Sequence, residues 1–139
     1  MENTWIFTFG QTIRVFNALK DEELKLKIAG IYGYRDLAAF KNHISAIVNI
    51  RNICSHNGIL FDYNQPIGVR KIPNKMYKLK TRNQTNLNAS ISVIFNILSS
   101  ISKNRTTELK ENLDKLIGEA LAIPELNEII QQKISYEIK

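Results

Sequence analysis

The residues most able to do chemistry are an arginine and a histidine, Arg51 and His56, which stand at the end of an apolar helical run just before Asn57-Gly58. Histidine changes its charge near neutral pH, so it can accept or donate a proton. The planar guanidinium of arginine can bind phosphate and stabilise charge that develops on it. RNA can be cleaved without a metal if its own 2′-hydroxyl attacks the adjacent phosphorus. The pair therefore predicts an RNA-cutting site.

Helix geometry sets a condition on this site. Two residues five positions apart on an ideal helix diverge by about 140°. Arg51 and His56 converge only if the helix ends before His56, which Asn57-Gly58 favours because glycine readily takes the left-handed C′ conformation. Alternatively, two such helices face each other and form one composite cleft. Asn52 lies about 40° from His56 around the helix and could orient its ring or bind the substrate. Spacing alone favours a structural His56 that caps the helix end.

Other kinds of site find less support. The chain has no glycine-rich phosphate loop, and His43 and His56 lack the Cys or His companions of a structural zinc site. A Cys54–His56 nucleophile pair is disfavoured because residues two apart on a helix point about 200° apart. Cys54 is the single cysteine, which excludes an intrachain disulfide and fits a reducing cytoplasm. We therefore expect no metal and no cofactor.

The elements that must position these residues read as helices. Six glycines, three prolines and apolar residues at three- and four-residue spacing predict an all-α fold, and 139 residues predict a single domain, 1–139. A bundle of about five helices is expected. The ranges are 4–19, 21 to about 30–33, 36–55, 86–102 and 106 or 107 to 121, with a short terminal helix over 124–134.

The third of these helices carries two stripes. The apolar stripe ends at Arg51, where an apolar residue would be expected, and comprises Leu37, Phe40, Ile44, Ile47 and Val48. The second stripe is polar and lacks the lysines and glutamates of a solvent-facing surface, and comprises Asn42, Ser45, Asn49, Asn52 and His56. It indicates contact with another helix, a partner subunit or a ligand, or else an ordinary half-exposed face. The second helix carries Leu24, Ile28 and Ile31 as its apolar residues.

A long connection follows the third helix. Periodicity fails over residues 59–84, where Pro66, Gly68 and Pro73 predict a partly ordered loop. No acidic residue lies between Asp62 and Glu108, and all of the net charge of +6 comes from this interval. With Tyr77 interleaved, the connection is consistent with phosphate contacts and base stacking, the alternative being a solvated basic loop. The candidate substrate-binding residues are Arg70, Lys71, Lys75, Lys78, Lys80 and Arg82.

Nothing in the sequence indicates a membrane protein. Met1 to Gly10 lacks the basic and continuous apolar regions of a signal peptide, and no apolar run approaches the roughly 20 residues of a membrane span. We therefore expect a soluble, cytoplasmic protein without a membrane partner.

The residues around Arg51 resemble those of a known family. The run Leu37-Ala38-Ala39-Phe40 … Ile50-Arg51-Asn52-Ile53-Cys54-Ser55-His56-Asn57 is similar to the Abi-like (abortive infection, phage-resistance) proteins, in which a similar helix leads into an L-R-N-I-C-A-H-H type signature. The segment Trp5 … Phe9-Gly10 … Leu19 looks like the family's W…SFG…L…L region, and helix 86–102 fits the helix that follows. The resemblance implies the HEPN superfamily of helical bundles, whose motif Arg-x4–6-His with a polar residue after the arginine is matched by Arg51, Asn52 and His56.

This resemblance implies a metal-independent endoribonuclease that leaves a 2′,3′-cyclic phosphate. It implies a homodimer with both motifs lining one cleft, His56 as acid or base, Arg51 on phosphate and Asn52 in support. An antitoxin or regulatory partner is also expected. Asn57 replaces the family's frequent second histidine, and Gly58-Ile59 departs from its usual continuation. The resemblance further implies that the chain corresponds to the family's C-terminal half, as a fragment or a short member. The alternatives are a catalytically inactive RNA-binding or helical interaction module and a dimerisation domain without a nucleic-acid partner.

Overall fold

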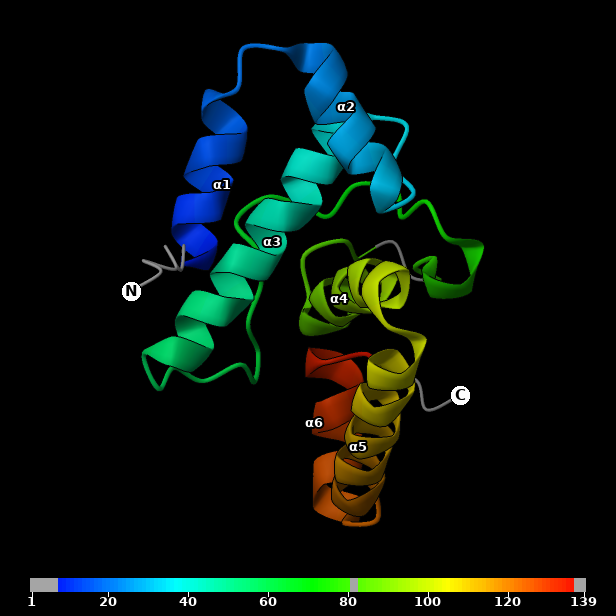
Figure 1. The fold of residues 1–139 in the computed structure, drawn as a ribbon. Helices are drawn as coiled ribbons and strands as arrows, with labels where there is room; N and C mark the ends of the chain where they lie inside the picture. The colour runs from blue at the N-terminus through cyan, green and yellow to red at the C-terminus, as the bar shows by residue number, and fades with distance from the viewer. Residues whose placement is uncertain (1–7, 81–82, 137–139) are drawn as a thin grey trace, which may run out of the picture.

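A computed structural model describes residues 8–80 and 83–136, which form six α-helices and one short 3-10 helix and contain no strand (Figure 1). The prediction of an all-α fold with a long connection after the third helix is confirmed. The expected start of the first helix before Thr8 lies outside the described residues. The elements are α1 (Phe9–Ala18), α2 (Glu22–Ile31), α3 (Leu37–Ser55), η1 (Lys75–Tyr77), α4 (Leu87–Ile101), α5 (Lys103–Leu121) and α6 (Pro124–Lys133).

Polar side chains set the starts of the first five α-helices. Each cap accepts a hydrogen bond from a backbone N–H of the first turn, which would otherwise lack a partner. The caps are Thr8, Asp21, Asp36, Asn86 and Ser102. The fifth helix begins at Lys103, so the start at 106 or 107 that the sequence predicted is wrong. Ser102 accepts from Arg105 N instead, and the Thr106 hydroxyl donates inside the helix to Ser102 O at 2.8 Å.

α4 is the central helix of the fold. It contacts α3, α5 and η1, whereas α5 packs against α6 and α2 against α3. Eight of its residues are buried, more than in any other helix described. The largest hydrophobic cluster forms around it and comprises Ile50, Leu87, Ile91, Phe95, Ile117, Ile130, Ile134 and Tyr136. α4 therefore joins the α1–α3 part of the chain to the α5–α6 hairpin (Figure 1).

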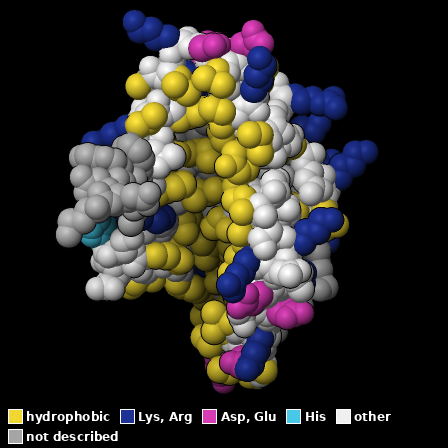
Figure 2. All heavy atoms as spheres, viewed as in Figure 1, with side chains coloured by type: hydrophobic (Ala, Val, Ile, Leu, Met, Phe, Trp, Pro, Cys, Tyr) yellow, Lys and Arg dark blue, Asp and Glu magenta, His cyan; other side chains and the backbone are white. Residues whose placement is uncertain are grey.

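The first two helices leave apolar side chains exposed. In α2, Leu24 and Ile31 are 42% and 73% exposed, whereas Lys25 is only 4% exposed. The side of α2 that the sequence predicted to be buried, with Leu24 and Ile31, is thus exposed. The buried side carries Ala29, whose small side chain lets α2 approach Tyr34 and Phe40. The Lys25 ammonium is satisfied by Glu22 at 2.8 Å. α1 has no buried residue, and hydrophobic side chains line a hollow down the middle of the face in Figure 2.

The connection after α3 is packed rather than loose. Gln65, Val69 and Ile72 are at most 4% exposed, and Val69 and Ile72 belong to one hydrophobic cluster with Ala46 of α3 and Val93 of α4. Two backbone bonds of 2.7 Å, Gln65 N to Thr85 O and Val69 N to Gln84 O, hold its two ends together. The Gln65 amide donates to Ala46 O and to Ser90 Oγ, both at 3.0 Å. This segment is therefore more ordered than the sequence predicted, and it forms part of the core.

Candidate functional site

α3 presents Arg51 to solvent. Its buried residues are Ala39, Phe40, His43, Ala46 and Ile50, so the buried line is rotated from the stripe expected from sequence. Ile50 belongs to the α4-centred cluster, and the neighbouring Arg51 is turned out of it. The arginine at the end of the expected stripe therefore needs no buried partner, and its guanidinium is available to a ligand.

The helix ends where the sequence predicted. Its last residue is Ser55, and His56 is the C-cap with φ −107° and ψ 22°. The left-handed residue, however, is Asn57 with φ 54°, not Gly58. Gly58 is needed for a different reason, since a Cβ there would lie 2.7 Å from Ile53 Cγ2. Gly58 N donates to Ile53 O at 2.8 Å, which is the six-to-one bond of a Schellman motif and fixes the backbone beside His56.

The three predicted catalytic residues are all exposed at this helix end. Arg51 Nη1 donates to Asn52 Oδ1 at 3.1 Å. Asn52 therefore orients the guanidinium, whereas the sequence had assigned it to the imidazole or the substrate. The Ser55 hydroxyl donates to Arg51 O at 2.7 Å, which satisfies one of the last carbonyls of the helix. A guanidinium has five N–H donors, so the bond to Asn52 leaves donors for a phosphate group.

Much of the polar stripe on α3 is used within the chain. Asn42 Nδ2 donates to Gly68 O at 3.2 Å, and its Oδ1 accepts from Arg70 N at 2.8 Å. Asn49 Nδ2 donates to Gln65 Oε1 at 2.9 Å. These amides bind the connection within the same chain. Beyond them, Asn52 and His56 remain exposed at the end of the stripe.

A buried histidine that the sequence reasoning left without a role anchors the same connection. His43 is 0% exposed, with Nε2 at 2.9 Å from Arg70 O and Nδ1 at 2.6 Å from Tyr34 Oη. Because a carbonyl only accepts, Nε2 carries the proton and Nδ1 accepts from the tyrosine. Asn96 Nδ2 donates to the same Tyr34 oxygen at 2.8 Å. Burial lowers the pKa of His43 and raises that of Tyr34, so both are neutral here. The signal available in the sequence was helical spacing, since His43 stands three residues after the core residue Phe40.

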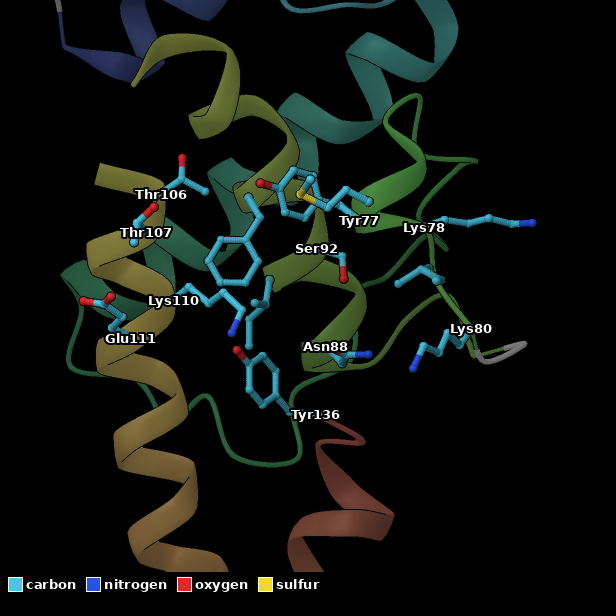
Figure 3. Close-up of a pocket in the computed structure, with 14 residues that line it drawn as sticks. Tyr77, Lys78, Lys80, Asn88, Ser92, Thr106, Thr107, Lys110, Glu111 and Tyr136 are labelled. Carbon is cyan, nitrogen blue, oxygen red and sulfur yellow. The ribbon is translucent and has the colours of Figure 1, made fainter. Parts of the chain in front are cut away.

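The candidate substrate-binding residues lie beside different depressions of the surface. Arg82 lies outside the described residues, and the other five are exposed. Arg70, whose Nη1 lies 3.9 Å from Asp36 Oδ2, lines a depression of about 330 Å³ on the polar face of α3, together with Lys41. Lys78 and Lys80 instead line a cavity of about 360 Å³ beside α4 and α5 (Figure 3). Lys71 and Lys75 line neither.

Two further observations concern what the chain could hold. Within residues 8–80 and 83–136, no three His, Cys, Asp or Glu side chains group closely enough to hold a metal ion. In the same part of the chain, every helix is too short or too polar to cross a membrane.

One comparison with known proteins finds a match in the first part of the chain. Residues 4–62 match the family described as Abi-like protein. The match includes α1 to α3 and therefore Arg51, Asn52 and His56, and it stops before the basic residues of the connection. The resemblance to this family seen in the sequence is thus confirmed, whereas the HEPN superfamily stays a prediction. No curated protein and no solved structure matches the chain.

Proposed function

We propose, on the premise that residues 4–62 belong to the Abi-like family, that this protein acts in abortive infection by cutting RNA. The observation that carries the proposal is the end of α3. There Arg51, held by Asn52 at 3.1 Å, and His56, held at the helix C-cap, are both exposed within the matched segment. A base and a phosphate-binding cation on one accessible helix end are the groups that metal-independent RNA cleavage needs.

The proposed reaction is an attack by the RNA on itself. His56 takes the proton of a 2′-hydroxyl, whose oxygen forms a bond to the adjacent phosphorus. Arg51 stabilises the negative charge that develops on the phosphorane oxygens. The bond from phosphorus to the 5′-oxygen then breaks, and that oxygen takes up a proton. The products are a 2′,3′-cyclic phosphate and a 5′-hydroxyl.

A second copy of the chain completes the proposed site. One copy supplies one histidine at this helix end, whereas the reaction needs a base for the 2′-hydroxyl and an acid for the leaving oxygen. Two helix ends that face each other would supply His56 twice. The exposed apolar side chains of α1 and α2, including Val15 at 52% and Ile31 at 73%, support an interaction surface in this half of the chain.

The RNA backbone is proposed to lie along the polar face of α3. Arg70 and Lys71 follow a segment that Asn42 holds against that helix, so their charges are carried by a fixed backbone. Contacts between such residues and phosphates release counterions, and the affinity for RNA should therefore fall steeply with salt. Reversing the charge of both residues should weaken RNA binding and reduce this salt dependence.

The testing experiment is an RNA cleavage assay with and without EDTA. Wild-type protein should cut in EDTA and leave a cyclic phosphate, while His56→Ala and Arg51→Ala should each lose at least 100-fold in rate with the fold intact. Cys54→Ala is the matched control, because this exposed neighbour tests the alternative Cys54–His56 pair and should retain full cleavage. Loss of activity in EDTA, or normal cleavage by His56→Ala, would contradict the mechanism.

Light scattering at the assay concentration tests the composite site. An excess of His56→Ala mixed with wild type should reduce cleavage by more than dilution alone, because a mixed dimer carries only one His56 and the reaction needs both a base and an acid. A fully active monomer would contradict this part of the proposal.

A catalytically inactive RNA-binding module is the second candidate. The observation that favours it is that the Asn52 amide oxygen accepts from Arg51 and is therefore not used to orient His56. In that case wild type and His56→Ala should bind RNA equally in a salt-dependent manner, and neither should yield a cleavage product.

A further inference from the structure

The cavity of about 360 Å³ lies away from the proposed cleavage site and is enclosed by separate parts of the chain. One wall is η1 with the residues just after it, another is α4, and the others are the start of α5 and Tyr136 (Figure 3). None of its lining residues belongs to α3. We propose that this cavity binds a nucleotide, with the base between the apolar walls and the phosphate at the basic mouth.

The inner walls suit a flat aromatic ring. Tyr77 of η1 and Phe95 of α4 have ring centroids 5.8 Å apart with an angle of 36° between their planes. Ile91, one helical turn before Phe95, continues this wall, and both are buried at 9% and 6% exposure. Pockets for small molecules are mostly apolar with a few placed polar groups, and this volume lies in their usual range of roughly 300–1,000 Å³. Such walls can stack on a base without requiring one base identity.

Polar groups stand where they can contact the edge of a base. Asn88 and Ser92 lie one turn apart on α4 and line the same cavity (Figure 3). An amide supplies both donors and an acceptor, and a hydroxyl supplies one of each, which matches the mixed edge of a nucleobase. Both residues are half-buried, so their hydrogen bonds with a ligand would be partly shielded from water.

The charges favour an anionic group at the mouth. Lys78 and Lys80 belong to the segment without acidic residues, and both line the cavity. Lys110 also lines it and pairs with Asp114, which accepts from the Tyr136 hydroxyl at 2.8 Å. The charge of Asp114 is thus already compensated. The Lys110–Asp114 pair is neutral overall, so Lys78 and Lys80 outnumber Glu111, the carboxylate of the lining, two to one.

This inference is independent of RNA cleavage. The cavity is built on α4, α5 and η1, whereas the proposed cleavage residues are at the end of α3. His56→Ala should therefore bind the nucleotide like wild type. A failure to observe RNA cleavage would therefore not contradict nucleotide binding, and a failure to observe nucleotide binding would not contradict RNA cleavage.

Calorimetric titration of the whole chain with adenosine 5′-monophosphate tests the inference, with uridine 5′-monophosphate, adenosine and inorganic phosphate as comparison probes. Both nucleotides should bind. Adenosine and inorganic phosphate should each bind at least tenfold more weakly, because each lacks half of the recognised groups. No binding by either nucleotide at millimolar concentration, or equal binding of phosphate alone, would overturn the proposal.

Variants locate the site. Ser92→Phe should fill the cavity and abolish binding, and Asn88→Leu, a smaller change, should weaken it at least fivefold if Ser92→Phe fails to fold. Lys78→Glu with Lys80→Glu should weaken binding at least tenfold. Lys103→Glu with Lys115→Glu makes the same charge change at two exposed lysines of α5 outside the cavity, and it should leave the affinity within twofold. An equal loss of nucleotide affinity in the two double variants would mean that the positive charge of the chain attracts the nucleotide without a specific site, and it would overturn the assignment.

Discussion

The imidazole of His43 donates through Nε2 to the carbonyl oxygen of Arg70, 27 residues further along the chain, at 2.9 Å. Its other nitrogen accepts from Tyr34, whose oxygen accepts in turn from Asn96. One buried ring therefore joins α3 to the bend before it, to α4 and to the basic connection. The proposed RNA-binding residues Arg70 and Lys71 depend on this bond for their backbone position.

Replacing His43 should destabilise the fold. In His43→Ala the Tyr34 hydroxyl and the Arg70 carbonyl lose their partner in a buried place, and a cavity is left, so we expect a loss of about 3 kcal/mol in the free energy of unfolding. Urea denaturation measures this change. His56→Ala is the matched control, since that histidine is exposed and its loss should change stability by less than about 0.5 kcal/mol. Equal urea midpoints for the two variants would contradict the role given to His43.

Stability should also depend on pH through the same ring. Burial lowers the pKa of His43 in the folded protein. In the unfolded chain the histidine keeps its ordinary pKa of about 6.5, so below that pH the unfolded chain binds more protons than the folded protein does. The stability contributed by the neutral ring is fully present above pH about 6.5 and is lost as pH falls below it, by up to about 1.4 kcal/mol per pH unit. Urea denaturation between pH 8 and 5 should show this slope in wild type and in His56→Gln. In His43→Gln, which cannot titrate, the slope should be absent, and its persistence would assign it to another group.

The bond between Arg51 and Asn52 makes a prediction about cleavage. Arg51→Lys keeps the charge but removes the planar fork, so it should lose at least about tenfold in rate despite its conservative appearance. Asn52→Ala removes one hydrogen bond to the guanidinium, which at about 1 kcal/mol corresponds to a loss of about fivefold. Single-turnover RNA cleavage would measure both. If Asn52→Ala were as inactive as His56→Ala, Asn52 would have to act on the substrate or the imidazole instead.

The turn after α3 predicts opposite effects for its two small residues. Gly58→Ala places a Cβ 2.7 Å from Ile53 Cγ2 and should cost about 1–3 kcal/mol, as overpacked sites do. Asn57→Gly relieves a positive φ of 54° and should leave stability unchanged or raise it by up to about 1 kcal/mol. Gly30→Ala in α2 is the control, because nothing lies near its Cβ, and helix propensity should make it stabilising by about 0.5–1 kcal/mol. Thermal unfolding should give Gly58→Ala a lower melting temperature than wild type, and Asn57→Gly and Gly30→Ala melting temperatures equal to or above that of wild type. A stable Gly58→Ala would mean that the turn can open.

Local signals made the helices predictable. Capping residues such as Asp21 and Asp36 and the pair Asn57-Gly58 act within a few residues, so the bounds of α2 and α3 could be read closely from the sequence. The chemistry of Arg51 and His56 could likewise be inferred, because the residue types and the helix end are both local. The backbone conformation of each turn residue was harder to predict, because the residue in the left-handed conformation is Asn57 rather than Gly58.

The orientation of the helices could not be read in the same way. Which side of a helix is buried depends on elements that arrive from elsewhere in the chain. Lys25 is buried and Leu24 exposed because of the approach of α2 to Tyr34 and Phe40, and the buried line of α3 runs through His43 because its partners come from Tyr34 and Arg70. The division of the basic residues between two depressions follows from the path of the connection, which no spacing rule gives.

The packed connection has a consequence for how a ligand would bind. Gln65 and Val69 are buried and bonded to the other end of the same segment, so Arg70 cannot swing away from α3 unless these bonds break. The charge that Arg70 would bring to an RNA chain is therefore carried on a backbone that is already ordered before binding. Association should pay little conformational entropy on the protein side, and most of the ordering cost should fall on the ligand.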